Sequence, residues 1–230
     1  SAMDRLEEAI ACYEEALIHK PNDANLHNSL GGALQELGRH SDAIACFVTA
    51  LSLAPEFAET HSNLGISLKE TNRFDEALKS YERALSIQPN FSEAHSNKGN
   101  VLKDLGRLDE ASTCYRQALA IQPDYAEARC NLGGVLTSMG QLDEALNCYE
   151  RTLTDKPDHR LASNNYLHTL LYQPGISNDD LFNACQKIAS KRESISDLEP
   201  LTTLNPEKGE RIRIGYISSD FREHPLGNNV

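Results

Sequence analysis

The sequence has 230 residues, of which 40% are hydrophobic and 6% aromatic, and it contains no tryptophan. This length allows one large domain or two small ones, and the apolar content is sufficient for a core. The formal net charge of −12 argues against binding to nucleic acid or to an anionic membrane surface, because both require a basic face. No run of about 18 apolar residues is present, so the sequence predicts no transmembrane helix.

A period of 34 residues organises the first two-thirds of the chain. Four kinds of residue recur at this step, namely the prolines 21, 55, 89, 123 and 157, the glycines 31, 65, 99 and 133, the alanines 9, 43, 77, 111 and 145, and the aromatic residues Tyr13, Phe47, Tyr81, Tyr115 and Tyr149. A 34-residue period of helix–turn–helix units is the signature of the tetratricopeptide repeat (TPR). We therefore predict an all-α superhelical TPR solenoid.

The predicted units follow one another from the first residue. Residues 1–23 supply only the second helix of a partial repeat, and the complete repeats are 24–57, 58–91, 92–125 and 126–159. At the end of each first helix, a residue able to adopt the left-handed conformation is expected: Gly38, Asn72, Gly106 and Gly140. We also expect an aspartate to cap three of the second helices: Asp75, Asp109 and Asp143.

The periodicity fades after residue 159. Residues 160–193 indicate a degenerate repeat followed by a capping helix at 179–193, which would cover the apolar end of the stack. Residues 194–210 form a polar linker, and residues 212–217 alternate in the manner of a β-strand. By this pattern, residues 211–230 would begin an α/β domain. The family resemblance given below implies that this is the start of a truncated Rossmann-like catalytic domain and that the polypeptide itself is catalytically inert.

Asparagine recurs two residues before the helix glycine, on the helix expected to line the inner face of the stack. The column contains Asn63, Asn97, Asn131 and Asn165, with Ser29 in the first complete repeat. Each amide offers one acceptor and two donors, which suits the main chain of an extended peptide whatever its side chains. The simpler alternative is that each asparagine satisfies a neighbouring turn. We favour peptide binding in the concave groove.

Histidines and cysteines also follow the period. His27, His61 and His95 fall on successive units, about 8–10 Å apart, which is too far for one metal ion, so the sequence predicts no metal site. Four cysteines recur at multiples of 34: Cys12, Cys46, Cys114 and Cys148. Such unpaired thiols, packed as small hydrophobes, suit a reducing compartment, and we expect a cytoplasmic protein.

The closing stretch carries a resemblance. A TPR array, a linker and then "RIRIGYISSDFREHP" resemble the protein O-linked N-acetylglucosamine transferases and their bacterial and plant relatives. The repeat segments "SNLG", "ALSIQPNF" and "ALAIQPDY" are also similar to that family. In these proteins the "GY.SSDF..HP" motif opens the first half of a two-lobed Rossmann-like catalytic region.

This resemblance implies specific roles. His224 would lie at the active site as a candidate base, although a lone loop histidine judged without the family is more often solvated. The asparagine column at 63, 97, 131 and 165 would hold acceptor proteins. The donor would be a nucleotide-sugar, UDP-GlcNAc or GDP-fucose, with no cofactor in this fragment, and a homodimer could form through the convex TPR face.

Two other functions stay open from the sequence. The chain could be a stand-alone TPR adaptor that binds peptides without catalysis. It could also be part of a different TPR-fused α/β enzyme.

Overall fold

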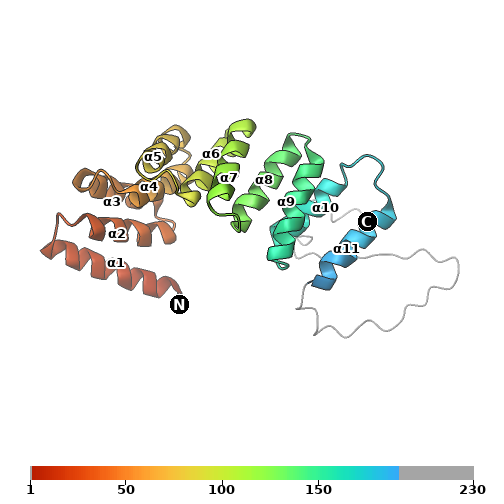
Figure 1. The fold of residues 1–230 in the computed structure, drawn as a ribbon. Coiled ribbons are helices and arrows are strands. Elements are labelled where there is room, and N and C mark those ends of the chain that lie inside the picture. The colour runs from red at the N-terminus through yellow and green to blue at the C-terminus, as the bar shows by residue number, and fades with distance from the viewer. Residues whose placement is uncertain (1, 192–230) are drawn as a thin grey trace. The chain divides into compact units, whose positions relative to one another are not determined.

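The computed structural model describes residues 2–191, and this part of the chain contains helices and no β-strand (Figure 1). The helices are α1 Ala2–His19, α2 Ala24–Glu36, α3 His40–Leu53, α4 Ala58–Glu70, α5 Phe74–Ile87, α6 Ser92–Asp104, α7 Leu108–Ile121, α8 Ala126–Ser138, α9 Leu142–Asp155, α10 Arg160–Leu170 and α11 Asn178–Lys191. The all-α repeat architecture expected from the period is confirmed for this part. Residues 194–210, the strand predicted at 212–217 and His224 lie outside it.

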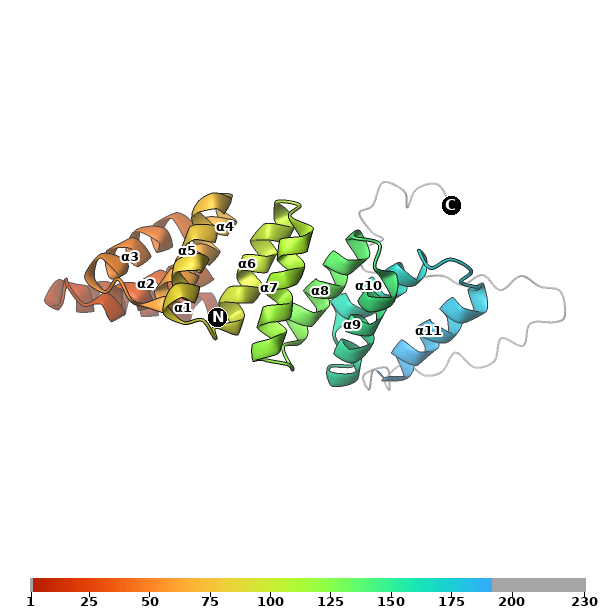
Figure 2. The same cartoon turned by 45° about the horizontal axis from the view of Figure 1, so that its top comes forward.

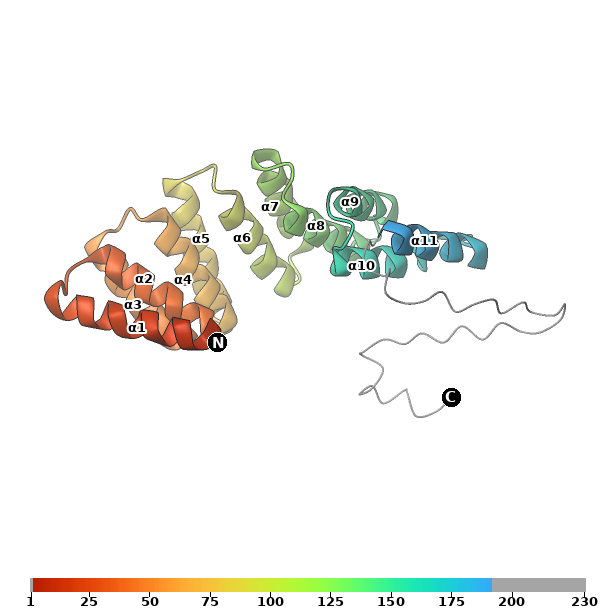
Figure 3. The ribbon, with the colours of Figure 1, turned by 90° about the horizontal axis from the view of Figure 1, so that it is seen from below.

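The helices pack in chain order (Figures 2 and 3). Within each repeat the first helix packs along the second, as α2 does on α3, and the second then packs on the first helix of the next repeat. The first helices of neighbouring repeats, α2, α4, α6, α8 and α10, also contact one another in sequence. The second helices make no comparable contact with each other, so α2, α4, α6, α8 and α10 form the inner face of the stack.

The glycine and aromatic columns form one repeated contact. A Cβ atom built on Gly65 would lie 2.7 Å from the ring of Tyr81, and one on Gly99 would lie 2.9 Å from the ring of Tyr115. The same close approach joins Gly31 to Phe47 and Gly133 to Tyr149. These rings are almost completely buried. Glycine is therefore required at this position because any side chain would displace the ring that fills the core of the repeat.

The turns within the repeats confirm one prediction and correct another. Gly38, Asn72, Gly106 and Gly140 all have positive φ values, between 59° and 76°. The aspartate caps are wrong, because α5, α7 and α9 are preceded by Arg73, Arg107 and Gln141 as N-cap residues without side-chain cap bonds. The left-handed residue turns the chain so tightly that the helix begins directly after these residues. The aspartates consequently lie in the first turn, where their charge complements the helix dipole.

The C-terminal end of the described stack is a helical hairpin. Helix α11 begins with a reciprocal capping arrangement, in which Ser177 N donates to Asp180 Oδ2 at 3.0 Å and Asp180 N donates to Ser177 Oγ at 3.2 Å. Leu170 of α10 and Ala184 of α11 join Leu146 in a small apolar cluster. Helix α11 thereby covers apolar surface of α9 and α10.

Within residues 2–191, no helix is long and apolar enough to cross a bilayer.

Candidate functional site

The asparagine column runs along the inner face of the stack. Asn63 lies on α4, Asn97 on α6, Asn131 on α8 and Asn165 on α10, and all four side chains are half-buried. Because these helices contact one another in sequence, the column crosses the stack from repeat to repeat. The period thus places one amide per repeat on a single surface.

A hollow marks the N-terminal end of this surface. It measures about 420 Å³ and lies between α1, α2 and α4, with Tyr13, Ser29 and Asn63 among its lining residues. Gln35 bridges α2 to α4 beside it, donating from Nε2 to the Asn63 carbonyl oxygen at 2.9 Å and to Ser67 Oγ at 2.8 Å. Ser29, which replaces asparagine in the first complete repeat, therefore faces open space rather than a packed neighbour.

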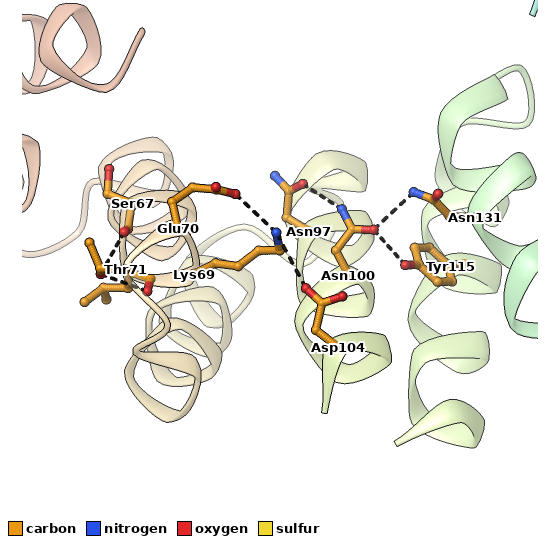
Figure 4. A network of polar contacts seen from close by, with 10 residues as sticks. Ser67, Lys69, Glu70, Thr71, Asn97, Asn100, Asp104, Tyr115 and Asn131 are labelled. Atoms are coloured by element: carbon orange, nitrogen blue, oxygen red, sulfur yellow. Dashed lines mark hydrogen bonds and ion pairs between the residues drawn. The ribbon is translucent and has the colours of Figure 1, made fainter. Parts of the chain in front are cut away.

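A second asparagine connects two members of the column (Figure 4). Asn100 lies three residues after Asn97 on α6, and its Nδ2 approaches Asn97 Oδ1 at 3.5 Å. Its Oδ1 accepts from Tyr115 Oη at 2.7 Å and from Asn131 Nδ2 at 3.1 Å. The network joins α6, α7 and α8, so it couples the groove surface to the buried aromatic column.

The C-terminal end of the column has a related arrangement. Burial raises the pKa of Tyr149, and the polar side chains of Thr137, Thr169 and Asn165 beside the phenol act in the opposite direction. Thr137 Oγ1 lies 3.5 Å from Tyr149 Oη and 3.0 Å from Thr169 Oγ1, which links α8, α9 and α10. The column member Asn165 thus also lies beside a buried tyrosine.

Tyr81 departs from this pattern. Its hydroxyl is buried and has no hydrogen-bond partner in the described part of the chain. The residue at the position of Asn100 in this repeat is Ile66, which offers no polar group. Burial raises the pKa of Tyr81 strongly, because the charged phenolate would be desolvated.

Charges on the inner face are paired across repeats. The Lys69 ammonium on α4 lies 3.2 Å from Glu70 Oε1 and 3.6 Å from Asp104 Oδ2 on α6 (Figure 4). These side chains are partly exposed, so the pair contributes little to stability. Its effect is to place charges of both signs beside the asparagine column, which does not select an acidic or a basic ligand.

The histidine column has a structural role. His27, His61 and His95 are half-buried, and the Nε2 atom of each lies 2.8–3.0 Å from the carbonyl oxygen of the proline six residues earlier. Arg129 takes the same place in the next repeat and donates to the Pro123 carbonyl and to Asp155. Across residues 2–191, no three His, Cys, Asp or Glu side chains gather in a group that could hold a metal ion.

The cysteine column is less uniform than the period suggests. Cys114 and Cys148 are buried and Cys46 is partly so, whereas Cys12 on α1 is exposed. Burial raises the pKa of the Cys114 and Cys148 thiols, and it raises that of Cys130 to about 11. These buried thiols are therefore protonated at neutral pH and poor nucleophiles.

One residue of the candidate site escaped the sequence reasoning. Asn100 belongs to no 34-residue column, since the equivalent positions are Gly32, Ile66 and Gly134. The available signal was its spacing of three residues from Asn97, which puts both amides on one helix face. His224 lies outside the described residues, so its role as an active-site base stays a prediction.

Comparison with known proteins identifies the class of this stack. Models of the tetratricopeptide repeat match residues 2–38, 22–90, 68–117, 99–136 and 126–156. The chain belongs to the tetratricopeptide repeat proteins. The comparison with curated protein sequences gave no match.

Solved structures with the same fold are TPR proteins. TTC0263, a thermophilic TPR protein from Thermus thermophilus, is 27% identical, with a TM-score of 0.62, covering 74% of this chain and 93% of that one. YrrB, a TPR protein with an unusual peptide-binding site, is 22% identical, with a TM-score of 0.63 and coverage of 80% and 93%. MamA is 24% identical, with a TM-score of 0.61 and coverage of 66% and 88%.

Proposed function

We propose that the inner face of the stack binds an extended peptide or protein segment through its main chain. The observation that carries this proposal is the column of half-buried asparagine amides crossing α4, α6, α8 and α10. An amide can donate to a main-chain carbonyl and accept from a main-chain N–H, so such a column recognises an extended backbone irrespective of sequence. Lys69, Glu70 and Asp104 give this face charges of both signs, which fits recognition of a main chain rather than of charged side chains.

Two further observations support peptide binding. The hollow of about 420 Å³ beside Ser29 and Asn63 provides open space at one end of the column. YrrB, which shares the fold, has a peptide-binding site.

The role of the column is tested with a triple variant that carries Asn63→Ala, Asn97→Ala and Asn131→Ala. Peptides are selected on the wild-type protein from a degenerate library of proline-free decapeptides, and affinities are measured by fluorescence anisotropy. Each lost hydrogen bond removes about 1 kcal/mol, so affinity should fall about 100-fold. Because these side chains are only half-buried, helicity and the melting midpoint should change little.

Asn147→Ala is the matched control. Asn147 is an exposed asparagine on α9, a second helix, and lies off the inner face. This variant should bind the selected peptides as the wild type does. Unchanged affinity in the triple variant would remove the column from the binding site.

A second candidate function is that of the acceptor-binding arm of a protein O-glycosyltransferase. The observation that favours it is the "RIRIGYISSDFREHP" segment, whose resemblance to O-linked N-acetylglucosamine transferases extends to His224. In that setting the groove would hold acceptor proteins, and the donor would be UDP-GlcNAc or GDP-fucose.

This candidate is tested with a chain that carries a complete catalytic region after the repeats. Labelled UDP-GlcNAc and GDP-fucose are offered with a mixture of acceptor proteins, beside the His224→Ala variant. Transfer from one donor that is lost in the variant is the expected result. Absence of transfer from both donors leaves the stand-alone adaptor as the function.

A further inference from the structure

We propose that Asn100 is a positioning residue, which orients the neighbouring amides so that Asn97 presents hydrogen-bond donors and Asn131 presents an acceptor to a bound main chain. This inference rests on the proposed function, since it specifies how the same groove holds its peptide. It goes beyond a uniform amide column, because it assigns a hydrogen-bond donor role to Asn97 and an acceptor role to Asn131.

The first step concerns the hydrogen-bonding capacity of Asn100 itself. An amide oxygen accepts two hydrogen bonds, and both are used here, by Tyr115 Oη at 2.7 Å and Asn131 Nδ2 at 3.1 Å. The Nδ2 group is directed to Asn97 Oδ1 at 3.5 Å. Asn100 is thus occupied by protein groups, and its function is to hold its neighbours (Figure 4).

The second step is the orientation of Asn100. The Tyr115 ring is fully buried between the helices and fixed against Gly99, so its hydroxyl is a stationary donor. The 2.7 Å contact directs the Asn100 oxygen toward it and turns the Nδ2 group toward Asn97. The buried aromatic core consequently determines which end of the amide faces each neighbour.

The third step follows for the two column members. One N–H of Asn131 is engaged by Asn100, and within residues 2–191 no group donates to Asn131 Oδ1. Asn97 uses its Oδ1 on Asn100, while its Nδ2 has no acceptor in the same described range. Asn97 therefore keeps both N–H donors but only one free lone pair, and Asn131 keeps both lone pairs but only one free N–H. This bias favours donation from Asn97 to a peptide carbonyl and acceptance by Asn131 from a peptide N–H. The shorter contact makes Asn131 the more firmly held of the two.

The fourth step is the match to a peptide. First helices of successive repeats lie about 8–10 Å apart, a distance that two or three residues of extended chain span at about 3.3 Å each. Main-chain carbonyl and N–H groups alternate along such a chain. A donor on α6 followed by an acceptor on α8 fixes the register of the backbone without reading any side chain.

The closing experiment uses backbone-modified peptides. In the selected decapeptide, each amide is replaced in turn by an ester, which removes one N–H donor while keeping the side chains. One ester position should weaken binding to the wild type by about 3- to 10-fold. That loss should disappear in Asn131→Ala and persist in Asn97→Ala, because Asn131 rather than Asn97 receives this peptide N–H. If the ester effect on affinity were reduced equally in Asn97→Ala and Asn131→Ala, the donor and acceptor roles assigned to these residues would be overturned.

Variants of Asn100 test its positioning role. Asn100→Ala should weaken binding of the unmodified peptide by about 3- to 10-fold and abolish the coupling between the ester and Asn131. Asn100→Asp keeps an oxygen acceptor for Tyr115 and Asn131 but has no N–H for Asn97, so it should retain that coupling. Asn147→Ala again serves as the control. Full coupling in Asn100→Ala would contradict the proposal.

A ligand-free measurement separates this inference from the proposed function. In side-chain amide NMR spectra of the free chain, Asn100→Ala should shift the Asn97 and Asn131 signals on α6 and α8. Unshifted signals would overturn the network itself, whatever the peptide result. If the triple alanine variant binds peptide normally while these signals do shift, the proposed function fails and the network stands.

Discussion

The repeats 58–91 and 92–125 share their framework and differ at the edge of the groove. Each has a glycine against a fully buried tyrosine ring, with Gly65 on Tyr81 and Gly99 on Tyr115. In the later repeat the tyrosine hydroxyl donates to Asn100 at 2.7 Å. In the earlier one Ile66 occupies that position, and the hydroxyl of Tyr81 has no partner in the described part of the chain.

This difference shows that the framework and the groove lining are set by separate positions. The glycine and the aromatic residue recur because they fill the interior of every repeat. The residue directly after the glycine differs between repeats, as Gly32, Ile66, Asn100 and Gly134. A position that varies within a strictly periodic array can be changed without loss of the fold, so individual repeats can acquire different ligand contacts.

The largest expected effect is on the pH dependence of stability, and it tests the feature that the two repeats share, a buried phenol. Burial raises the pKa of both Tyr81 and Tyr115 above the ordinary value of 10.0. The folded state therefore retains these protons when the unfolded chain has lost them, so the stabilising contribution is complete below pH 10 and declines as the pH rises further. Each tyrosine should lower the free energy of unfolding by about 1.4 kcal/mol per pH unit above 10.

The measurement is urea denaturation between pH 9 and pH 11. Tyr81→Phe and Tyr115→Phe should each remove an equal share of the pH dependence, which separates the tyrosines from lysine and cysteine titration. A pH slope that only one variant reduces would show that the two phenols are not equivalently buried.

A second prediction concerns the shared glycine–tyrosine contact. Gly65→Ala and Gly99→Ala place a Cβ atom 2.7–2.9 Å from a buried ring, so each should destabilise its repeat by about 1–2 kcal/mol. Gly134→Ala is the control, because its Cβ would meet only the Tyr149 hydroxyl, at 3.8 Å. Alanine there should stabilise α8 by about 0.5–1 kcal/mol through helix propensity. Thermal melts in which all three variants behave alike would contradict the steric argument.

The framework could be predicted from the sequence because its determinants recur. The 34-residue columns place Gly99 and Tyr115 correctly in the core, and the left-handed position of Asn72 follows from its place in the glycine column. The aspartate caps failed because the helices start two residues earlier than expected, a difference set by turn geometry that spacing alone does not resolve. Such an error moves Asp75 from the cap into the first turn.

The candidate site was predictable in position but not in its hydrogen bonding. The period puts Asn97 and Asn131 on one surface, since equivalent residues of stacked repeats align. Asn100 interacts with Tyr115 and Asn131, which are 15 and 31 residues away, and these contacts depend on side-chain conformations at a junction of three helices. No single column records that arrangement. The role of His224 depends on the resemblance of the closing segment alone.

The smallest expected effect is the change in stability at neutral pH when each tyrosine hydroxyl is removed, and it tests the difference between the two repeats. Tyr115→Phe removes the donor to Asn100 and should destabilise the chain by about 1 kcal/mol. Tyr81→Phe removes a buried hydroxyl without a protein partner, so it should be neutral or stabilising by up to about 1 kcal/mol. The midpoints of urea denaturation at pH 7 give both changes in the free energy of unfolding, provided that the slope of this free energy against urea concentration is unchanged. Equal destabilisation would mean that Tyr81 finds a hydrogen-bond partner in solution, and the contrast drawn between Ile66 and Asn100 would then be lost.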